Sequence, residues 1–69
     1  MAEYQVSFYK TLLSPHGMPS SCVQAEIRVA DAPTPADAAV VAEREFARSR
    51  GIPDWRLCAD VFEVRPASR

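Results

Sequence analysis

The residues with the most chemical capacity in this chain are His16, Cys22, Asp54 and Cys58. A thiolate, an imidazole and a carboxylate that converge can bind a metal ion or activate a nucleophile. Their spacing matches no metal-binding motif, and two cysteines with one histidine are too few for a closed zinc site. A histidine in a loop is usually solvated, and a cysteine in a strand usually fills a small apolar space. We therefore predict no catalytic residue, no metal and no cofactor, and keep His16 and Asp54 as a candidate polar cluster.

Trp55 and a pair of helix arginines are the next candidates. The indole of Trp55 could stack on a flat ligand or base, although a tryptophan that opens a strand more often closes the end of a small core. Arg44 and Arg48 could contact phosphate, but Glu43 and Glu45 lie beside them and favour a solvated helix face. The sequence shows no phosphate-binding loop, nucleophile elbow or paired catalytic carboxylates. An enzyme is therefore the function class that the sequence supports least.

The length and net charge of the chain limit the number of domains and the kinds of partner that we expect. The chain has 69 residues, enough for one small domain, and a formal net charge of −1. A dedicated nucleic-acid module usually carries a strong basic excess, so nucleic acid is a disfavoured partner. The sequence contains no apolar run of the length that spans a bilayer and no signal-peptide pattern, so we expect a cytoplasmic protein that does not enter a membrane. Both cysteines should then be free thiols.

Three stretches alternate between apolar and polar residues, which is typical of β-strands. They span about residues 4–13, 22–30 and 55–65. The segment 14–21 between the first two strands contains two prolines and one glycine. This turn chemistry predicts a hairpin with a loose connection.

The segment between the second and third strands carries the signals of a helix over about residues 35–50. Thr34 stands at the N-cap position and Pro35 at the first helical position, where its missing N–H costs nothing. Asp37 suits the positive helix start, in the manner of a capping box. Gly51 supplies a left-handed stop at the other end.

These elements predict an α+β fold of ββαβ type, a single domain over residues 1–69 with one helix on one face of a three-stranded sheet. The connection from the second strand to the third should be a right-handed crossover, the default for parallel strands in one sheet. The predicted strand order is 2-1-3, with the first strand central, while the order 1-2-3 stays open. Successive side chains of a strand point to opposite faces, so one face of the sheet should hold the core under the helix. The predicted core consists of Val6, Phe8, Val23, Ala25, Ile27, Val29, Phe46, Leu57, Ala59 and Val61.

The opposite face of the sheet is the predicted interface or ligand surface. A partly apolar face left uncovered usually marks a partner surface, and edge strands add unpaired backbone groups. The residues assigned to this candidate surface are Tyr9, Cys22, Arg28, Trp55, Cys58, Phe62 and Val64.

The run YQVSFYKTLLSPHG, the cysteine after it and the run GIPDWRLCADVFEV resemble a family of small uncharacterised bacterial proteins, a domain of unknown function. The resemblance covers most of the chain, implies a bacterial protein and brings no activity. The order of elements is also similar to the ribosomal protein LX type, but this chain lacks the basic charge of an RNA-bound protein. Dodecins are similar in size and pack a helix on a three-stranded sheet around flavin, in a different element order.

Together these features predict a non-enzymatic interaction module, a homodimer that buries its outer sheet face or an edge strand; another protein partner is compatible with the same surface. A domain this small gains limited stability from its own core, which favours association. One alternative is a small-ligand binder with Trp55, Tyr9 and Phe62 around a pocket between subunits. The other is an RNA-associated or ribosome-associated accessory protein that binds through its arginines.

Overall fold

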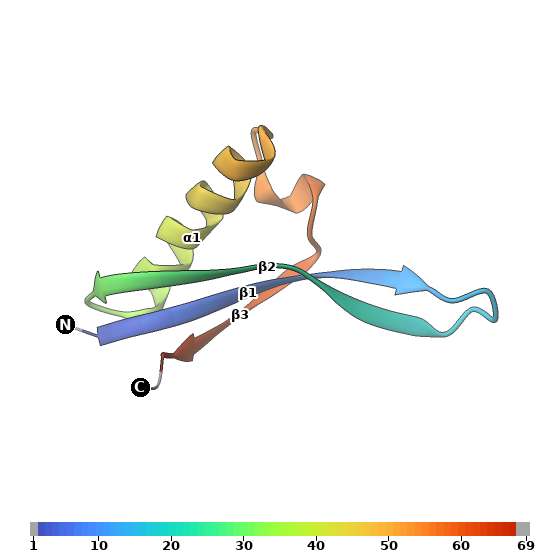
Figure 1. Ribbon diagram of the computed structural model, residues 1–69, viewed down its shortest axis with the longest axis horizontal. Coiled ribbons are helices and arrows are strands. Elements are labelled where there is room, and N and C mark those ends of the chain that lie inside the picture. The colour runs from blue at the N-terminus through green and yellow to red at the C-terminus, as the bar shows by residue number, and fades with distance from the viewer. Residues whose placement is uncertain (1, 68–69) are drawn as a thin grey trace.

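A computed structural model describes residues 2–67 as a sheet with one helix over it (Figure 1). The elements are β1 (Ala2–Leu13), β2 (Pro19–Ala32), helix α1 (Pro35–Arg50), the short 3₁₀ turn η1 (Trp55–Leu57) and β3 (Val61–Pro66). The strand order is β2-β1-β3, and β1 pairs antiparallel with both neighbours. The α+β class, the ββαβ order and the central position of the first strand are therefore confirmed.

Helix α1 begins and ends where its capping residues predict. The Thr34 hydroxyl accepts the backbone N–H of Asp37 at 3.2 Å and donates to the Asp37 carboxylate at 2.8 Å. Gly51 follows the last turn with φ 65°, the left-handed conformation that favours glycine. The face turned to the sheet buries three alanines, so that the helix can approach the strands closely, and Phe46 is the large anchor among them.

Phe8 on the central strand is the hub of the core. Its ring stacks on Phe46 with centroids 4.5 Å apart, and Trp55 and Phe62 approach it at 5.6 and 5.7 Å. Val6 and Phe46 are, like Phe8, fully buried. The remaining buried apolar side chains are mostly alanines, so the core consists of one aromatic cluster with a thin surround.

The third strand starts later than predicted. Asp54 caps η1 by accepting the backbone N–H of Arg56 at 3.0 Å, so residues 55–57 turn instead of extending. The strand then begins at Val61, and its pairing places Phe62 opposite Phe8 and Val64 opposite Val6. The predicted facing of this segment is therefore wrong: Phe62 and Val64 pack against the core.

Two residues of the predicted core lie outside it for the same reason. Leu57 is 61 % exposed in η1, and Val61 is 54 % exposed on the face of the sheet away from the helix. Ala59, another member of the predicted core, is fully buried.

A bulge in β2 overturns the predicted facing of its first residues. Phe8 pairs with Ala25 and Tyr9 with Val23, so Gln24 is an extra residue on β2. From that point Cys22 pairs with Lys10, on the helix side, and Val23 shares the outer face with Tyr9. Val23 is exposed and not part of the core.

The hairpin of β1 and β2 extends well past the helix and past β3 (Figure 1). Asp60 lies directly before the third strand, which begins at Val61, and marks the end of the three-stranded part of the sheet. Its N–H donates to the Tyr9 carbonyl at 2.8 Å, and its carboxylate accepts the backbone N–H of Thr11 at 2.7 Å. Beyond Thr11 the sheet has only two strands, which gives a molecule with extents of 45 × 27 × 16 Å. We call this two-stranded extension, residues 11–21, the arm.

Candidate interaction surface

The arm carries apolar side chains that no other element covers. Leu13 is 73 % exposed and Met18 is 67 % exposed, and Leu12 is exposed beside them. The turn between the strands is held by the Ser14 hydroxyl, which accepts the backbone N–H groups of His16 and Met18. A two-stranded hairpin is at best marginally stable in water by itself. Exposed leucine on such an element suits a contact with a second surface.

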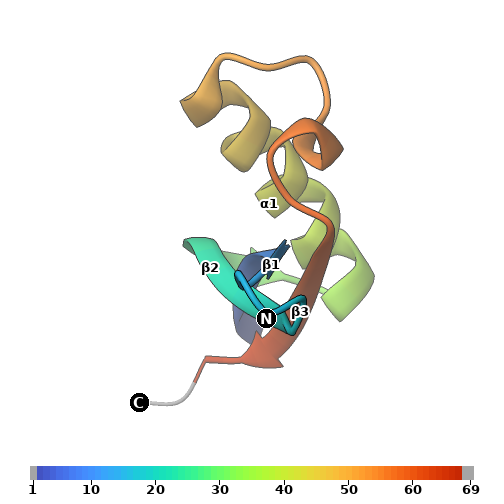
Figure 2. The same ribbon diagram turned by 90° about the vertical axis from the view of Figure 1, so that its right-hand side faces the viewer.

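The face of the sheet away from the helix, which we call the open face, is mostly polar. Figure 2 shows this face below the strands, on the side opposite α1. One apolar row crosses it, because Tyr9 pairs with Val23 on β2 and with Val61 on β3. The row lies at the base of the arm, and Thr11 and Ser21 separate it from Leu13 on this face.

Charged residues fill the rest of the open face. Arg65 forms an ion pair with Glu63 on the same strand, and Glu63 together with Tyr9 raises the pKa of the Arg65 guanidinium. Arg28 lies 3.5 Å from Glu3. Both arginines border a shallow hollow of about 230 Å³ next to Gln5. Because each guanidinium already has a carboxylate beside it, this hollow offers an anion little uncompensated positive charge.

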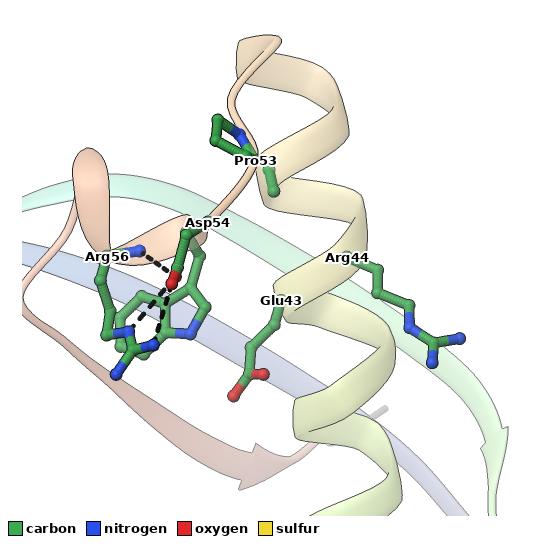
Figure 3. A pocket seen from close by; sticks show the side chains of 7 residues that line it. Glu43, Arg44, Pro53, Asp54 and Arg56 are labelled. Carbon is green, nitrogen blue, oxygen red and sulfur yellow. Dashed lines mark hydrogen bonds and ion pairs between the residues drawn. The ribbon is translucent and has the colours of Figure 1, made fainter.

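A second hollow, of about 280 Å³, lies between α1 and η1 (Figure 3). Arg56 donates from its guanidinium to the Asp54 carboxylate at 2.9 Å, and these hydrogen bonds hold the pKa of Asp54 below its ordinary value. Figure 3 shows Glu43 turned toward this pair and Arg44 turned away from it. In this hollow Asp54 and Arg56 are hydrogen-bonded to each other. None of the lining residues is a buried acid or base suited to proton transfer.

The structure does not bring the candidate polar cluster together. His16 is exposed in the turn at the tip of the arm, whereas Asp54 caps η1 beside the helix. Cys22 is half-buried on β2, and Cys58 is a half-buried free thiol packed against the core. Within residues 2–67, no three His, Cys, Asp or Glu side chains gather as a metal site would require.

Most aromatic and apolar members of the predicted surface belong to the core side instead. Trp55 contacts Phe62 with ring centroids 5.3 Å apart, and both rings pack on Phe8. Val64 and Cys58 also lie against the core. Of the predicted set, Tyr9 and Arg28 are the members that the strand pairing places on the open face. An aromatic pocket between subunits would therefore have to recruit Trp55 and Phe62 from the core.

Of the apolar residues of the arm, sequence reasoning considered Leu13 for the outer face of the sheet and gave Leu12 and Met18 no role. Leu12 and Leu13 stand next to each other, which breaks the alternation of the strand and gives two faces an apolar side chain. Met18 lies in a segment of turn residues, where an apolar side chain has no partner nearby in the sequence. Those two irregularities were the signal that could have located the surface.

No family model, curated protein or solved structure matches this chain. Among residues 2–67, no helix is long and apolar enough to cross a membrane.

Proposed function

We propose that this protein is a non-enzymatic interaction module that forms a homodimer through its arm and the adjoining sheet. The observation that carries the proposal is the arm itself, with Leu12, Leu13 and Met18 exposed on two strands that no helix covers. The small aromatic core gives a second reason. A domain of this size rarely obtains more than about 3–5 kcal/mol from its core alone, and association adds to that stability.

A second copy of the same chain is the partner that this surface fits best. The row Val23, Tyr9 and Val61 on the open face has polar residues on both sides: Thr11 and Ser21 toward the arm, and Ser7 with Glu26 and Glu63 toward the rest of the sheet. An apolar centre with a polar rim is the usual composition of a specific protein interface. Nothing in the arrangement concentrates positive charge, as an RNA contact would need.

The test is the oligomeric state of the full chain, measured by sedimentation velocity over a range of protein concentrations. We expect a dimer that dissociates when Leu13→Asp places a charge on the arm. The matched control is Leu57→Asp, because Leu57 is similarly exposed but lies in η1. The control should remain dimeric.

A monomer at every concentration for the unmodified chain would overturn the proposal. So would a dimer that Leu57→Asp dissociates and Leu13→Asp does not. Native mass spectrometry of the same samples reports any bound small molecule or RNA, and a stoichiometric adduct on a monomer would favour the ligand-binding alternative instead.

A further inference from the structure

The outer edge of β2 has a regular segment bounded by irregularities at both ends. Residues 25–29 pair one for one with residues 4–8 of β1, and the register shifts on either side of them. At one end Gln24 is the extra residue, and its carbonyl accepts a hydrogen bond from the Arg50 guanidinium at 2.6 Å. At the other end Asp31 has φ 61°, in the left-handed region. The uninterrupted part of this edge is therefore centred on Ile27.

Opposite charges flank that centre on the open face. Glu26 precedes Ile27 and Arg28 follows it, and their pairing with Ser7 and Gln5 places both on the side away from the helix. The Arg28 side chain is 58 % exposed and lies 3.5 Å from its nearest carboxylate on Glu3. Glu26 accepts a hydrogen bond from the Gln5 amide at 2.8 Å and is exposed. A strand with this arrangement is complementary to an antiparallel copy of itself.

We propose that β2 pairs antiparallel with β2 of a second copy, with Ile27 opposite the partner's Ile27. This inference rests on the proposed function and specifies the contact. The two three-stranded sheets join into one continuous sheet, whose order is β3-β1-β2 followed by the partner's β2-β1-β3. Pairing of an exposed edge with a second chain is the ordinary way in which a sheet satisfies its unpaired backbone groups.

This register determines which residues face each other across the two copies of β2 and on which side of the joined sheet the helices lie. Glu26 lies opposite the partner's Arg28, and Arg28 opposite the partner's Glu26, so the ion pair occurs twice. On the helix side, Ile27, which is half-buried in the single chain, meets the partner's Ile27. Because paired residues share a face, both helices lie on the same side of the joined sheet.

The arms extend the contact beyond these five residues. The two copies of β2 run in opposite directions, so the arm of each copy points along the far end of the partner's β2 and toward the start of its helix. Backbone pairing of five residues by itself buries less surface than the ~1,200 Å² of a stable interface. The exposed apolar residues of the arm supply the additional buried area.

The other edge of the sheet provides a matched comparison. Glu63 and Arg65 flank Val64 on β3 in the same way that Glu26 and Arg28 flank Ile27. On β3, however, the two side chains form an ion pair with each other, and the strand has 6 residues against 14 for β2. The edge of β2 is longer, and Glu26 and Arg28 do not form an ion pair with each other. We therefore propose that β2, and not β3, pairs with the second copy.

Charge reversal tests the register directly. Glu26→Arg places two arginines opposite each other twice, and Arg28→Glu does the same with glutamates. We expect each single variant to weaken dimerisation by about tenfold or more, because like charges directly opposite each other are destabilising. The double variant Glu26→Arg/Arg28→Glu restores both attractive pairs and should dimerise as the unmodified chain does.

Mixing the two single variants is the decisive step. One carries arginine at both positions and the other glutamate at both, so in this register they form a heterodimer with two attractive pairs. Native mass spectrometry separates this heterodimer from the homodimers by mass. We expect the heterodimer to dominate an equimolar mixture, and Glu63→Arg on the other edge to leave the dimer unchanged.

Failure of this inference is distinguishable from failure of the proposed function. A dimer that persists in Glu26→Arg and Arg28→Glu, or that Glu63→Arg abolishes, overturns the β2 pairing while the homodimer stands. Single variants that both dissociate but do not recombine overturn the register. A monomeric unmodified chain overturns both proposals, and the charges of β2 then serve to protect a free edge from pairing.

Discussion

Replacing Phe62 and Val61, two neighbours on β3, tests the facing of the third strand. In the structure Phe62 lies between Phe8 and Trp55, with ring centroids 5.7 and 5.3 Å away. Val61 is 54 % exposed on the opposite face. Apolar alternation from Trp55 onward predicts the reverse, with Val61 in the core and Phe62 outside. If Phe62 faces the core, Phe62→Ala should destabilise the protein more than Val61→Ala. If Val61 faces the core, the order should be the reverse.

The expected magnitudes follow from the packing. Truncation of a fully buried phenylalanine to alanine costs about 3–5 kcal/mol, and Phe62 is half-buried, so Phe62→Ala should cost about 2–4 kcal/mol. The loss of its two aromatic contacts is part of that cost. Val61→Ala removes exposed atoms and should change the free energy of unfolding by about 0.5 kcal/mol or less. Against a total of about 3–5 kcal/mol, Phe62→Ala leaves the domain barely folded.

Urea denaturation followed by far-ultraviolet circular dichroism measures both values. Circular dichroism is preferable to tryptophan fluorescence here, because Trp55 contacts Phe62 and its emission would change without unfolding. All samples need the same protein concentration, since dimerisation adds to the apparent stability. If Val61→Ala costs as much as Phe62→Ala or more, the reasoning from the strand register is refuted.

Two further predictions concern capping residues. Thr34→Ala should lower the free energy of unfolding by about 1 kcal/mol in urea denaturation, because the N–H of Asp37 loses its acceptor. Thr34→Ser keeps a hydroxyl at this position and should retain most of that stability. Equal losses in the two variants would contradict the role of Thr34 as the cap. The hydrogen bonds from Arg56 lower the pKa of Asp54, so the Asp54 carboxylate stabilises η1 above its unfolded pKa and this contribution is lost as the pH falls through its folded pKa. Arg56→Gln should raise the Asp54 pKa toward its ordinary value in a carboxyl NMR titration, and an unmoved titration curve would contradict that cause.

The parts of the fold that sequence reasoning located are those with local signals. Thr34 and Gly51 bound the helix because a cap depends on side chains and backbone within one turn. Residues 4–8 alternate cleanly on the central strand, where a single register satisfies both neighbours. The right-handed crossover accounts for the face of the sheet that the helix covers, whereas the sequence favours the strand order 2-1-3 and leaves 1-2-3 open. Each of these inferences needs only neighbouring residues or a general rule of chain geometry.

The parts that it misplaced depend on one extra residue or on one hydrogen bond. Gln24 interrupts no visible pattern, since Val23 and Ala25 continue the alternation of the residues after them, and the bulge appears only when β2 is paired with β1. Asp54 could be a loop residue or a cap, and its role as the cap of η1 shortens the third strand and reverses the facing of the residues after it. A shift of one residue moves every side chain of a strand to the other face.

That reversal changes the physical argument for association. With Phe62 and Val64 in the core, the open face has few apolar residues and offers weak grounds for burial as a whole. Exposed apolar side chains also lie on the helix, at Val40 and Val41, and in η1, at Leu57. The grounds for association that remain are the exposed apolar side chains of the arm and the unpaired backbone on the edge of β2. Both features belong to the same hairpin, so one contact with a second copy can cover them together. The bulge at Gln24 lies where the arm leaves the regular edge, and the Arg50 guanidinium on its carbonyl ties that point to the end of the helix.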